Sequence, residues 1–237
     1  MRKLPLLFLL MSLVTSAQVK YRGFGVFGSL TQSAHRYVNL DTDKKATDSL
    51  YKYYYAQSHI SKEFFNWGAG AFLELGGATA RWQTEVEYAN KGAKEMGLTN
   101  AYTGDRTGSY ATNKYTYIQW NNYYKGYYAA GLAHWYFLLG ARLEYLFKYS
   151  APVFPGFSDA FPKFWFSGDV ALGFEMPIAK KFHAFVEYHY NPDVLRHTHD
   201  NVKIGNRTLE LRAGIVMRPR KRSIDDCNAP VYRGPNY

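Results

Sequence analysis

Glu85 and Glu87 are the first residues in this 237-residue chain whose types and spacing could do chemistry. Paired carboxylates can share general acid–base work, one giving and one taking a proton. In a β-strand, however, residues two positions apart lie on the same face for geometric reasons alone. The spacing therefore carries almost no catalytic information, and we predict no catalytic residue here.

His197, His199 and Asp200 form the second group. Two histidines one residue apart on an extended backbone point the same way, and they could hold Zn²⁺ together with Asp200 or Asp193. Exposed histidines are common in loops, so these residues are weak metal candidates. The chain has no ordered Ser–His–acid motif, which leaves a lipid-modifying enzyme as the less favoured alternative. We therefore expect a non-enzymatic protein without a cofactor.

The segment that carries the glutamates, 81–88, alternates strictly between two kinds of side chain. Successive residues of a strand point to opposite faces, so this ribbon is polar on one side and aromatic or aliphatic on the other. The polar side holds Arg81, Gln83, Glu85 and Glu87, and the other holds Trp82, Thr84, Val86 and Tyr88. The pattern predicts a strand with one face in each of two different environments.

Similar alternation predicts eight strands, and short and long connections alternate between them. The predicted strands are 19–30, 65–75, 80–91, 115–124, 134–149, 164–176, 182–190 and 207–217. Long segments, 31–64 and 92–114, are expected to be loops. This order is typical of an antiparallel up-and-down transmembrane β-barrel with short periplasmic turns and long surface loops. A soluble barrel of the lipocalin kind, with the aromatic face inward, is the structural alternative.

The beginning of the chain predicts export. Arg2 and Lys3 precede an apolar run over 4–14, and small residues then suggest cleavage between Ala17 and Gln18. We expect a signal peptide over 1–17, a barrel over 18–218 and a basic periplasmic tail over 219–237. Nucleic-acid binding fits an exported protein poorly, and the single Cys227 cannot form an internal disulfide.

If the polar faces point inward, they build a charged lumen, which in an eight-stranded barrel is just wide enough to be filled by side chains. Acids outnumber bases on these faces, and buried unpaired charges are costly. We therefore expect Lys20 and Arg22 of the first strand to point inward as well, which places Tyr21 and Phe27 on the lipid side. The expected lumen network is Lys20, Arg22, Glu74, Arg81, Glu85, Glu87, Arg142, Glu144, Asp169, Glu175, Glu187, Glu210 and Arg212.

The first long loop is rich in tyrosine, which supplies rigid, amphipathic contact area. The residues that could bind a partner at the surface are Tyr37, Tyr51, Tyr53, Tyr54 and Tyr55. The same rings could instead fold down onto the barrel rim.

The stretch 85–94, EVEYANKGAK, resembles the third strand of outer-membrane barrels of the PorT-like group of Bacteroidetes. The stretches 137–145, 168–175 and 186–191 resemble its fifth, sixth and seventh strands. This resemblance implies an eight-stranded barrel in the outer membrane of a Gram-negative bacterium. Named members of the group are associated with type IX secretion and gliding, but the glycine-rich first strand and the basic tail depart from them.

The predicted function is therefore that of a closed, structural or accessory component of an outer-membrane complex, or of a surface-exposed binding protein. A narrow ion or solute channel is the main alternative. The expected surroundings are outer-membrane lipid and lipopolysaccharide, with a protein partner in the outer membrane or periplasm.

Overall fold

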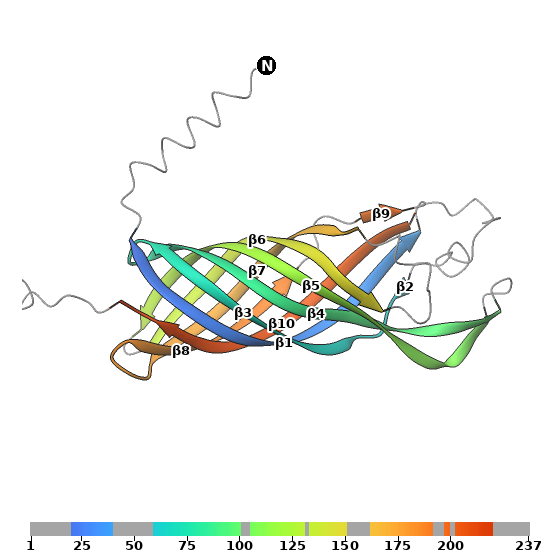
Figure 1. The fold of residues 1–237 in the computed structure, drawn as a ribbon, viewed down its shortest axis with the longest axis horizontal. Coiled ribbons are helices and arrows are strands. Elements are labelled where there is room, and N and C mark those ends of the chain that lie inside the picture. The colour runs from blue at the N-terminus through green and yellow to red at the C-terminus, as the bar shows by residue number, and fades with distance from the viewer. Residues whose placement is uncertain are drawn as a thin grey trace, which may run out of the picture.

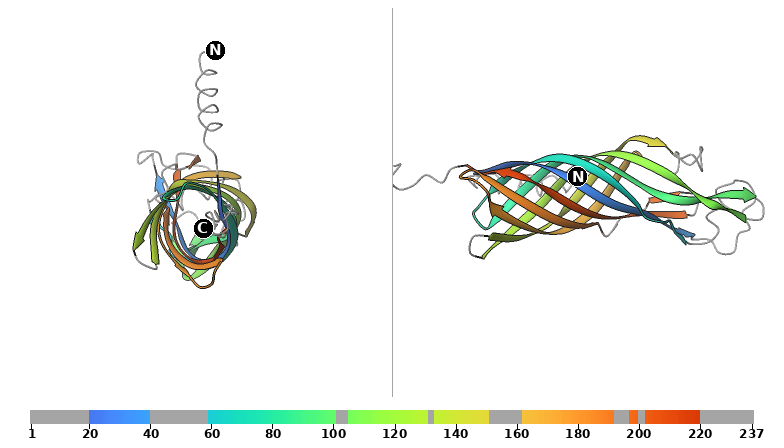
Figure 2. Two further views of the ribbon diagram at one scale, coloured as in Figure 1. Left: turned by 90° about the vertical axis from the view of Figure 1, so that its left-hand side faces the viewer. Right: turned by 90° about the horizontal axis from the view of Figure 1, so that it is seen from below.

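Eight long antiparallel strands form one sheet that closes on itself as a barrel, in a computed structural model (Figures 1 and 2). Each long strand pairs with the next along the chain, and β1 pairs with β10 to close the wall. The long strands are β1 (Tyr21–Asn39), β3 (Phe64–Gly76), β4 (Ala80–Asn100), β5 (Asp105–Ala130), β6 (Ala133–Ser150), β7 (Phe164–Pro177), β8 (Phe182–Asn191) and β10 (Val202–Met217). Two short strands, β2 (His59–Ile60) and β9 (His197–His199), pair with β1 and β10 respectively.

The structure describes residues 20–39, 59–100, 105–130, 133–150, 162–191, 197–199 and 202–219. The expected signal peptide over 1–17, most of the expected tail and Cys227 lie outside these residues. In the described part of the chain, no helix is long and apolar enough to cross a membrane.

Polar side chains line most of the inside of the barrel, together with buried apolar clusters such as Phe27, Phe72 and Phe185, and apolar side chains cover most of its outside. Glu85, Glu87 and Arg142 are fully buried, whereas Trp82 and Val86 are more than half exposed. The same division holds along the other long strands. The lipocalin alternative, with its aromatic face inward, is therefore wrong for this chain.

The outer face of β6 shows how the apolar surface is organised. Its ends carry exposed aromatic rings, Trp135 and Phe137 at one end and Tyr145 at the other, with Leu139 and Leu143 between them. At a rise of about 3.3 Å per residue and a strand tilt of about 40°, Phe137 and Tyr145 are separated by about 20 Å along the barrel axis. An aliphatic band of that height between two aromatic girdles is the pattern of a membrane-spanning barrel.

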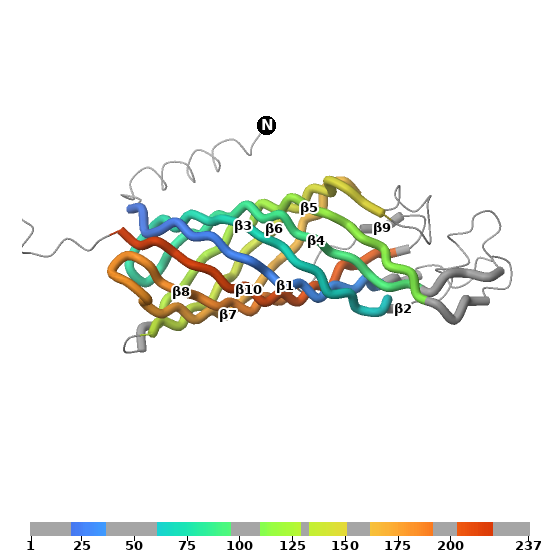
Figure 3. The backbone as a smooth tube through the Cα atoms, turned by 60° about the horizontal axis from the view of Figure 1, so that its bottom comes forward, coloured from blue at the N-terminus to red at the C-terminus, as the bar shows by residue number. Residues whose placement is uncertain are grey.

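Both described ends of the chain lie beside the short turns, at the end of the barrel that we call the turn end (Figure 3). Gly76, which closes β3, has a φ of 124°, a conformation that favours glycine. Its amide donates to the carbonyl of Lys20, and the amide of Arg218 donates to the carbonyl of Lys181. The start of β1 and the end of β10 are thus tied to the β3–β4 and β7–β8 turns.

Two segments that were expected to be loops are partly strand. β1 continues to Asn39, and β4 and β5 extend as a hairpin to Asn100 and from Asp105, past the ends of their neighbours (Figure 1). Backbone pairs such as Gly92–Lys114 and Lys94–Thr112 continue the ladder there. These pairs satisfy backbone hydrogen-bonding groups regardless of side-chain pattern, so alternation alone did not predict them.

The expected orientation of β1 is wrong for Phe27, although Tyr21 is 41% exposed as expected. Phe27 is buried inside the barrel, while Phe24, Val26 and Leu30 are exposed on its outer face. A register shift between Tyr21 and Gly23 reverses the alternation near the start of the strand, so parity counted from Lys20 does not carry through.

Candidate functional site

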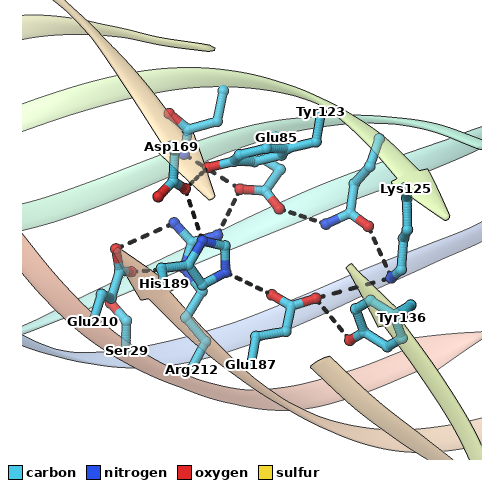
Figure 4. A network of polar contacts seen from close by, with 12 residues as sticks. Ser29, Glu85, Tyr123, Lys125, Tyr136, Asp169, Glu187, His189, Glu210 and Arg212 are labelled. Carbon is cyan, nitrogen blue, oxygen red and sulfur yellow. Dashed lines mark hydrogen bonds and ion pairs between the residues drawn. The ribbon is translucent and has the colours of Figure 1, made fainter. Parts of the chain in front are cut away.

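The centre of the lumen is organised by Arg212 of β10, which reaches across the barrel to β4 (Figure 4). Its Nη1 lies 2.7 Å from Glu85 Oε2, and its Nη2 lies 2.6 Å from Glu87 Oε2. Its Nε donates to Glu210 at 2.6 Å, and the guanidinium carbon lies 4.5 Å from the centroid of the Phe27 ring. β1 and β3 separate β10 from β4 in the wall, so these ion pairs span the interior.

A second arginine, Arg142 of β6, continues the network toward β7 and β10. Its Nη2 lies 2.7 Å from Asp169 Oδ2 and 3.0 Å from Glu210 Oε2. Glu210 therefore bridges both central arginines. The hydroxyl of Tyr123 donates to Asp169 at 2.6 Å, which anchors the carboxylate from the β5 side.

His189 of β8 lies between two carboxylates. Its Nδ1 is 2.7 Å from Asp169 Oδ2, and its Nε2 is 3.0 Å from Glu187 Oε2. When both carboxylates are ionised they only accept hydrogen bonds, and the ring then donates from both nitrogens and carries a positive charge. The hydroxyl of Tyr136 also donates to Glu187, at 2.8 Å. The histidine thus acts as a third cation of the central network.

At the turn end, Arg218 folds back into the mouth of the barrel directly after β10. Its guanidinium pairs with Glu74 of β3 and with Glu175 of β7. Lys125 of β5 donates to Glu74 at 2.8 Å, and its ammonium lies 3.8 Å from the centroid of the Tyr136 ring. These contacts tie opposite walls together and fill the mouth with side chains.

At the other end of the lumen, which we call the loop end, Lys91 of β4 pairs with Glu144 of β6 at 2.6 Å. Both side chains are at most 1% exposed. Tyr115 and Tyr117 of β5 are buried beside them, and Lys91 Nζ lies 5.6 Å from the centroid of the Tyr117 ring. Ion pairs and rings therefore occupy the lumen from one end to the other.

Such an arrangement is suited to holding a barrel shut rather than to turning over a substrate. Buried charges are tolerated when each is paired and hydrogen-bonded, and each central charged group has an ion-pair partner, although Arg142 Nη1 and Asp169 Oδ1 are buried without a hydrogen-bond partner in the part of the chain that the structure describes. Among the described residues there is no group of three or more His, Cys, Asp or Glu side chains that could hold a metal ion.

The structure places most of the expected lumen residues in this network. The buried ones are Glu74, Glu85, Glu87, Arg142, Glu144, Asp169, Glu175, Glu187, Glu210 and Arg212. Arg81 is 13% exposed and pairs with Glu74 at 2.8 Å.

The expectation for Lys20 is wrong, because its side chain is exposed at the turn end. Arg22 is half-buried, and its Nε donates to the carbonyl of Gly76 at 2.7 Å rather than to a lumen acid. Lys20 precedes β1 and Arg22 is the second residue of that strand, so both lie beside Gly76 at the turn end rather than beside the central carboxylates. They do not balance the lumen charge.

The missing positive charge comes from Lys125, Arg218 and His189 instead. The predicted fourth strand stopped at Tyr124, one residue short of Lys125, although Lys125 shares the parity of Gln119 and Tyr123. His189 was on the inward parity of its strand, and that signal alone could have placed it in the network. Arg218 lies outside the strand, so no alternation pointed to it.

The expected surface residues cannot be compared in the same way. The backbone of Tyr37 lies in β1, paired with Ile204, and the backbones of His197 and His199 lie in β9. The side chains of these three residues are outside the described part of the structure. Tyr51, Tyr53, Tyr54, Tyr55 and Asp200 also lie outside the described residues.

Comparison with known proteins gives no family. No protein-family model matches the chain, and no curated protein matches it. Neisserial surface protein A is a similar solved structure, at 13% identity and a TM-score of 0.39, covering 82% of this chain and 97% of that chain. Ail, the attachment invasion locus protein of Yersinia pestis, is 15% identical, with a TM-score of 0.34 and coverage of 83% and 99%.

The translocator domain of the autotransporter NalP from Neisseria meningitidis is 9% identical, with a TM-score of 0.24 and coverage of 90% and 94%. At these TM-scores, similarity carries no argument about function. The barrel assignment rests on the strand pairing described above.

Proposed function

We propose that this chain is a non-enzymatic outer-membrane β-barrel of a Gram-negative bacterium, closed by its own lumen side chains. The observation that carries the proposal is the division of side chains between the two faces of the wall. Fully buried ion pairs such as Arg212–Glu87 fill the inside, while an aliphatic band with aromatic ends covers the outside. Exposure of that apolar band to water would be unfavourable, whereas a bilayer buries it.

The proposed orientation has both chain ends and the short turns in the periplasm. Bacterial outer-membrane barrels have short periplasmic turns and longer surface loops, and the connections after β3, β5 and β7 are the short ones here. The β4–β5 hairpin and the loop between β1 and β3 would then face the cell exterior.

A closed barrel acts through what its ends contact. We place the chain as a structural or accessory component of an outer-membrane complex, or as a surface-exposed binding protein. The resemblance of 85–94 to the PorT-like group supports a link to secretion machinery of the type IX kind. The partner in that case is a protein of the outer membrane or periplasm.

The membrane assignment is tested by fractionating cells that express the full chain and running the outer-membrane fraction on gels without heating. We expect a band that migrates differently before and after boiling, as folded barrels do. Recovery in the soluble fraction would refute the proposal.

The closed lumen is tested by single-channel recording on the purified barrel in planar bilayers, where we expect no conductance. Discrete conductance steps would instead support a narrow channel. One observation favours that alternative: titratable groups extend through the lumen from Glu175 at the turn end to Glu144 at the loop end.

The accessory role is tested by affinity purification in mild detergent, with mass spectrometry of the eluate. A stoichiometric partner would support an accessory subunit, and a barrel that elutes alone would shift the assignment to a stand-alone surface protein. A lipid-modifying enzyme is tested separately by His197→Ala/His199→Ala, which we expect to leave lipid A unchanged.

A further inference from the structure

We infer that the outer wall at the loop end carries a binding site for the phosphate groups of an anionic glycolipid in the surrounding leaflet. The site is a cluster of three lysines, Lys62, Lys94 and Lys114, with two aromatic rings, Phe64 and Tyr110. It rests on the proposed function, because the wall must lie in a membrane for a lipid to reach it.

The backbone brings the three lysines together from different segments. Lys62 and Lys94 form an isolated antiparallel bridge, with their amides and carbonyls bonded at 3.1 and 2.9 Å. Lys114 follows on β5, where it pairs with Gly92, two residues before Lys94. Strand pairing therefore holds these positions in fixed register.

The side chains gather over the two rings. Lys94 Nζ and Lys114 Nζ lie 5.9 and 6.0 Å from the centroid of the Phe64 ring, and Lys62 Nζ lies 5.0 Å from that of Tyr110. Rings attract ammonium groups through their π faces, so they order the lysines without neutralising them. The outcome is a concentrated positive charge that has no ion pair with any acidic side chain that the structure describes.

Like charges directly opposite each other on neighbouring strands are destabilising. No ion pair to Lys62, Lys94 or Lys114 is found among the described residues, and Glu63 is the only acidic side chain there that is exposed. The three ammonium groups therefore repel one another, and a bound multivalent anion would relieve that repulsion. Phosphate suits it, because a tetrahedral dianion can accept hydrogen bonds from several ammonium groups at once.

The neighbouring surface indicates that the phosphate belongs to a lipid. Toward the middle of the barrel, the same face presents Phe65, Trp67 and Tyr88, which are 71%, 58% and 43% exposed. A ligand with phosphates beside acyl chains matches this arrangement of cations above an apolar wall. A soluble anion would gain nothing from the apolar part.

Further basic residues extend the cluster around the rim at this end. They are Arg36, Lys148, Lys163 and Arg207, all exposed. The rim as a whole attracts anionic headgroups, while the three-lysine cluster is the point where cations from separate segments converge.

The test uses the full barrel purified in zwitterionic detergent and titrated with fluorescent diphosphoryl lipid A. The variant is Lys62→Gln/Lys94→Gln/Lys114→Gln. Each lysine near an anionic surface contributes about a fivefold gain in affinity, so loss of three should weaken binding about a hundredfold. The charge-retaining variant Lys62→Arg/Lys94→Arg/Lys114→Arg should bind within a few-fold of the unmodified protein.

The matched control removes the same charge from the opposite end, as Lys20→Gln/Lys180→Gln/Lys181→Gln, three exposed lysines. Its affinity should be unchanged, and an equal loss in both variants would overturn the site in favour of general electrostatic attraction. Unaltered binding of lipid A without phosphates would also overturn it, as would displacement of the lipid by inorganic phosphate or heparin at matched charge.

Folding and membrane location are read separately in each variant, from the heat-dependent gel shift and outer-membrane fractionation. A barrel that folds in the outer membrane but binds no lipid A refutes this site alone. A chain that never reaches the membrane refutes the proposed function as well.

Discussion

Arg212→Met should be among the most destabilising single substitutions in the lumen. The guanidinium pairs with Glu85 and Glu87 at 2.7 and 2.6 Å, and no other ion pair to these two carboxylates is found among the described residues. Glu210 keeps Arg142 at 3.0 Å. The substitution therefore leaves two adjacent buried carboxylates without a cation, and breaking a buried pair in this way costs about 3–5 kcal/mol.

Urea unfolding of the barrel in detergent, followed by tryptophan fluorescence and the heat-dependent gel shift, measures this loss. With a denaturant slope of about 2–3 kcal/mol per molar, the midpoint should fall by more than about 1 M. Arg212→Met/Glu85→Gln/Glu87→Gln should recover most of the loss, because it removes the orphaned charges while keeping the side-chain volumes. A midpoint equal to that of the unmodified protein, or a triple variant no better than the single one, would refute the reasoning.

Three further results are expected. Arg218→Gln should cost only about 1–2 kcal/mol, because Glu74 keeps a 2.8 Å pair with Lys125 and Glu175 keeps a 2.9 Å contact with His183 Nδ1. It should introduce brief conductance steps in planar bilayers by loosening the turn-end mouth, and silent recordings would show that the mouth is closed without it. Leu139→Arg, at a 56% exposed position in the aliphatic band, should make the free energy of folding into bilayers less favourable by about 2–4 kcal/mol. Tyr149→Arg near the loop end should cost at most about 1 kcal/mol, and equal effects of the two substitutions would place the bilayer elsewhere. His189→Gln should lower stability by about 2–3 kcal/mol in urea titrations, since an amide cannot donate to carboxylates on both sides as a cation does.

Alternation was sufficient to predict the wall of the barrel and most of its lumen. Glu85, Arg142 and Arg212 were assigned to the interior because each lies in a strand whose polar and apolar residues alternate without interruption. Period-two geometry links all side chains in such a strand, so one correctly oriented residue orients the rest. The inward and outward faces of such strands can therefore be predicted from their own sequence, without information on the neighbouring strands.

The method failed where the geometry departs from a regular strand. At the start of β1, the register shift between Tyr21 and Gly23 breaks the link between parity and face, so the parity that places Tyr21 outside does not place Phe27 there. At the β4–β5 hairpin, backbone pairing continues beyond the region where side chains alternate clearly. Neither a bulge nor a ladder held by backbone hydrogen bonds leaves a dependable mark on side-chain pattern.

The charge balance of the lumen could be recognised as a problem from sequence, but its solution could not. The count of acids against bases on the predicted strands indicates missing cations, but some of those cations lie outside every predicted strand. Arg218 lies after the last strand and reaches Glu74, 144 positions away in the chain. A contact at that separation depends on how the barrel closes, which only the three-dimensional arrangement supplies.

The same distribution of charge explains why the barrel's surface is more basic than its composition suggests. The chain has a formal net charge of +10. Among side chains that the structure describes, all acids except Glu63 are buried in the lumen, where they are largely paired, so they do little to offset the exposed lysines and arginines of the two rims. Burial of the acids inside the barrel leaves the exposed bases of the two rims with few acidic neighbours among the described residues, and the proposed lipid site depends on this distribution of charge.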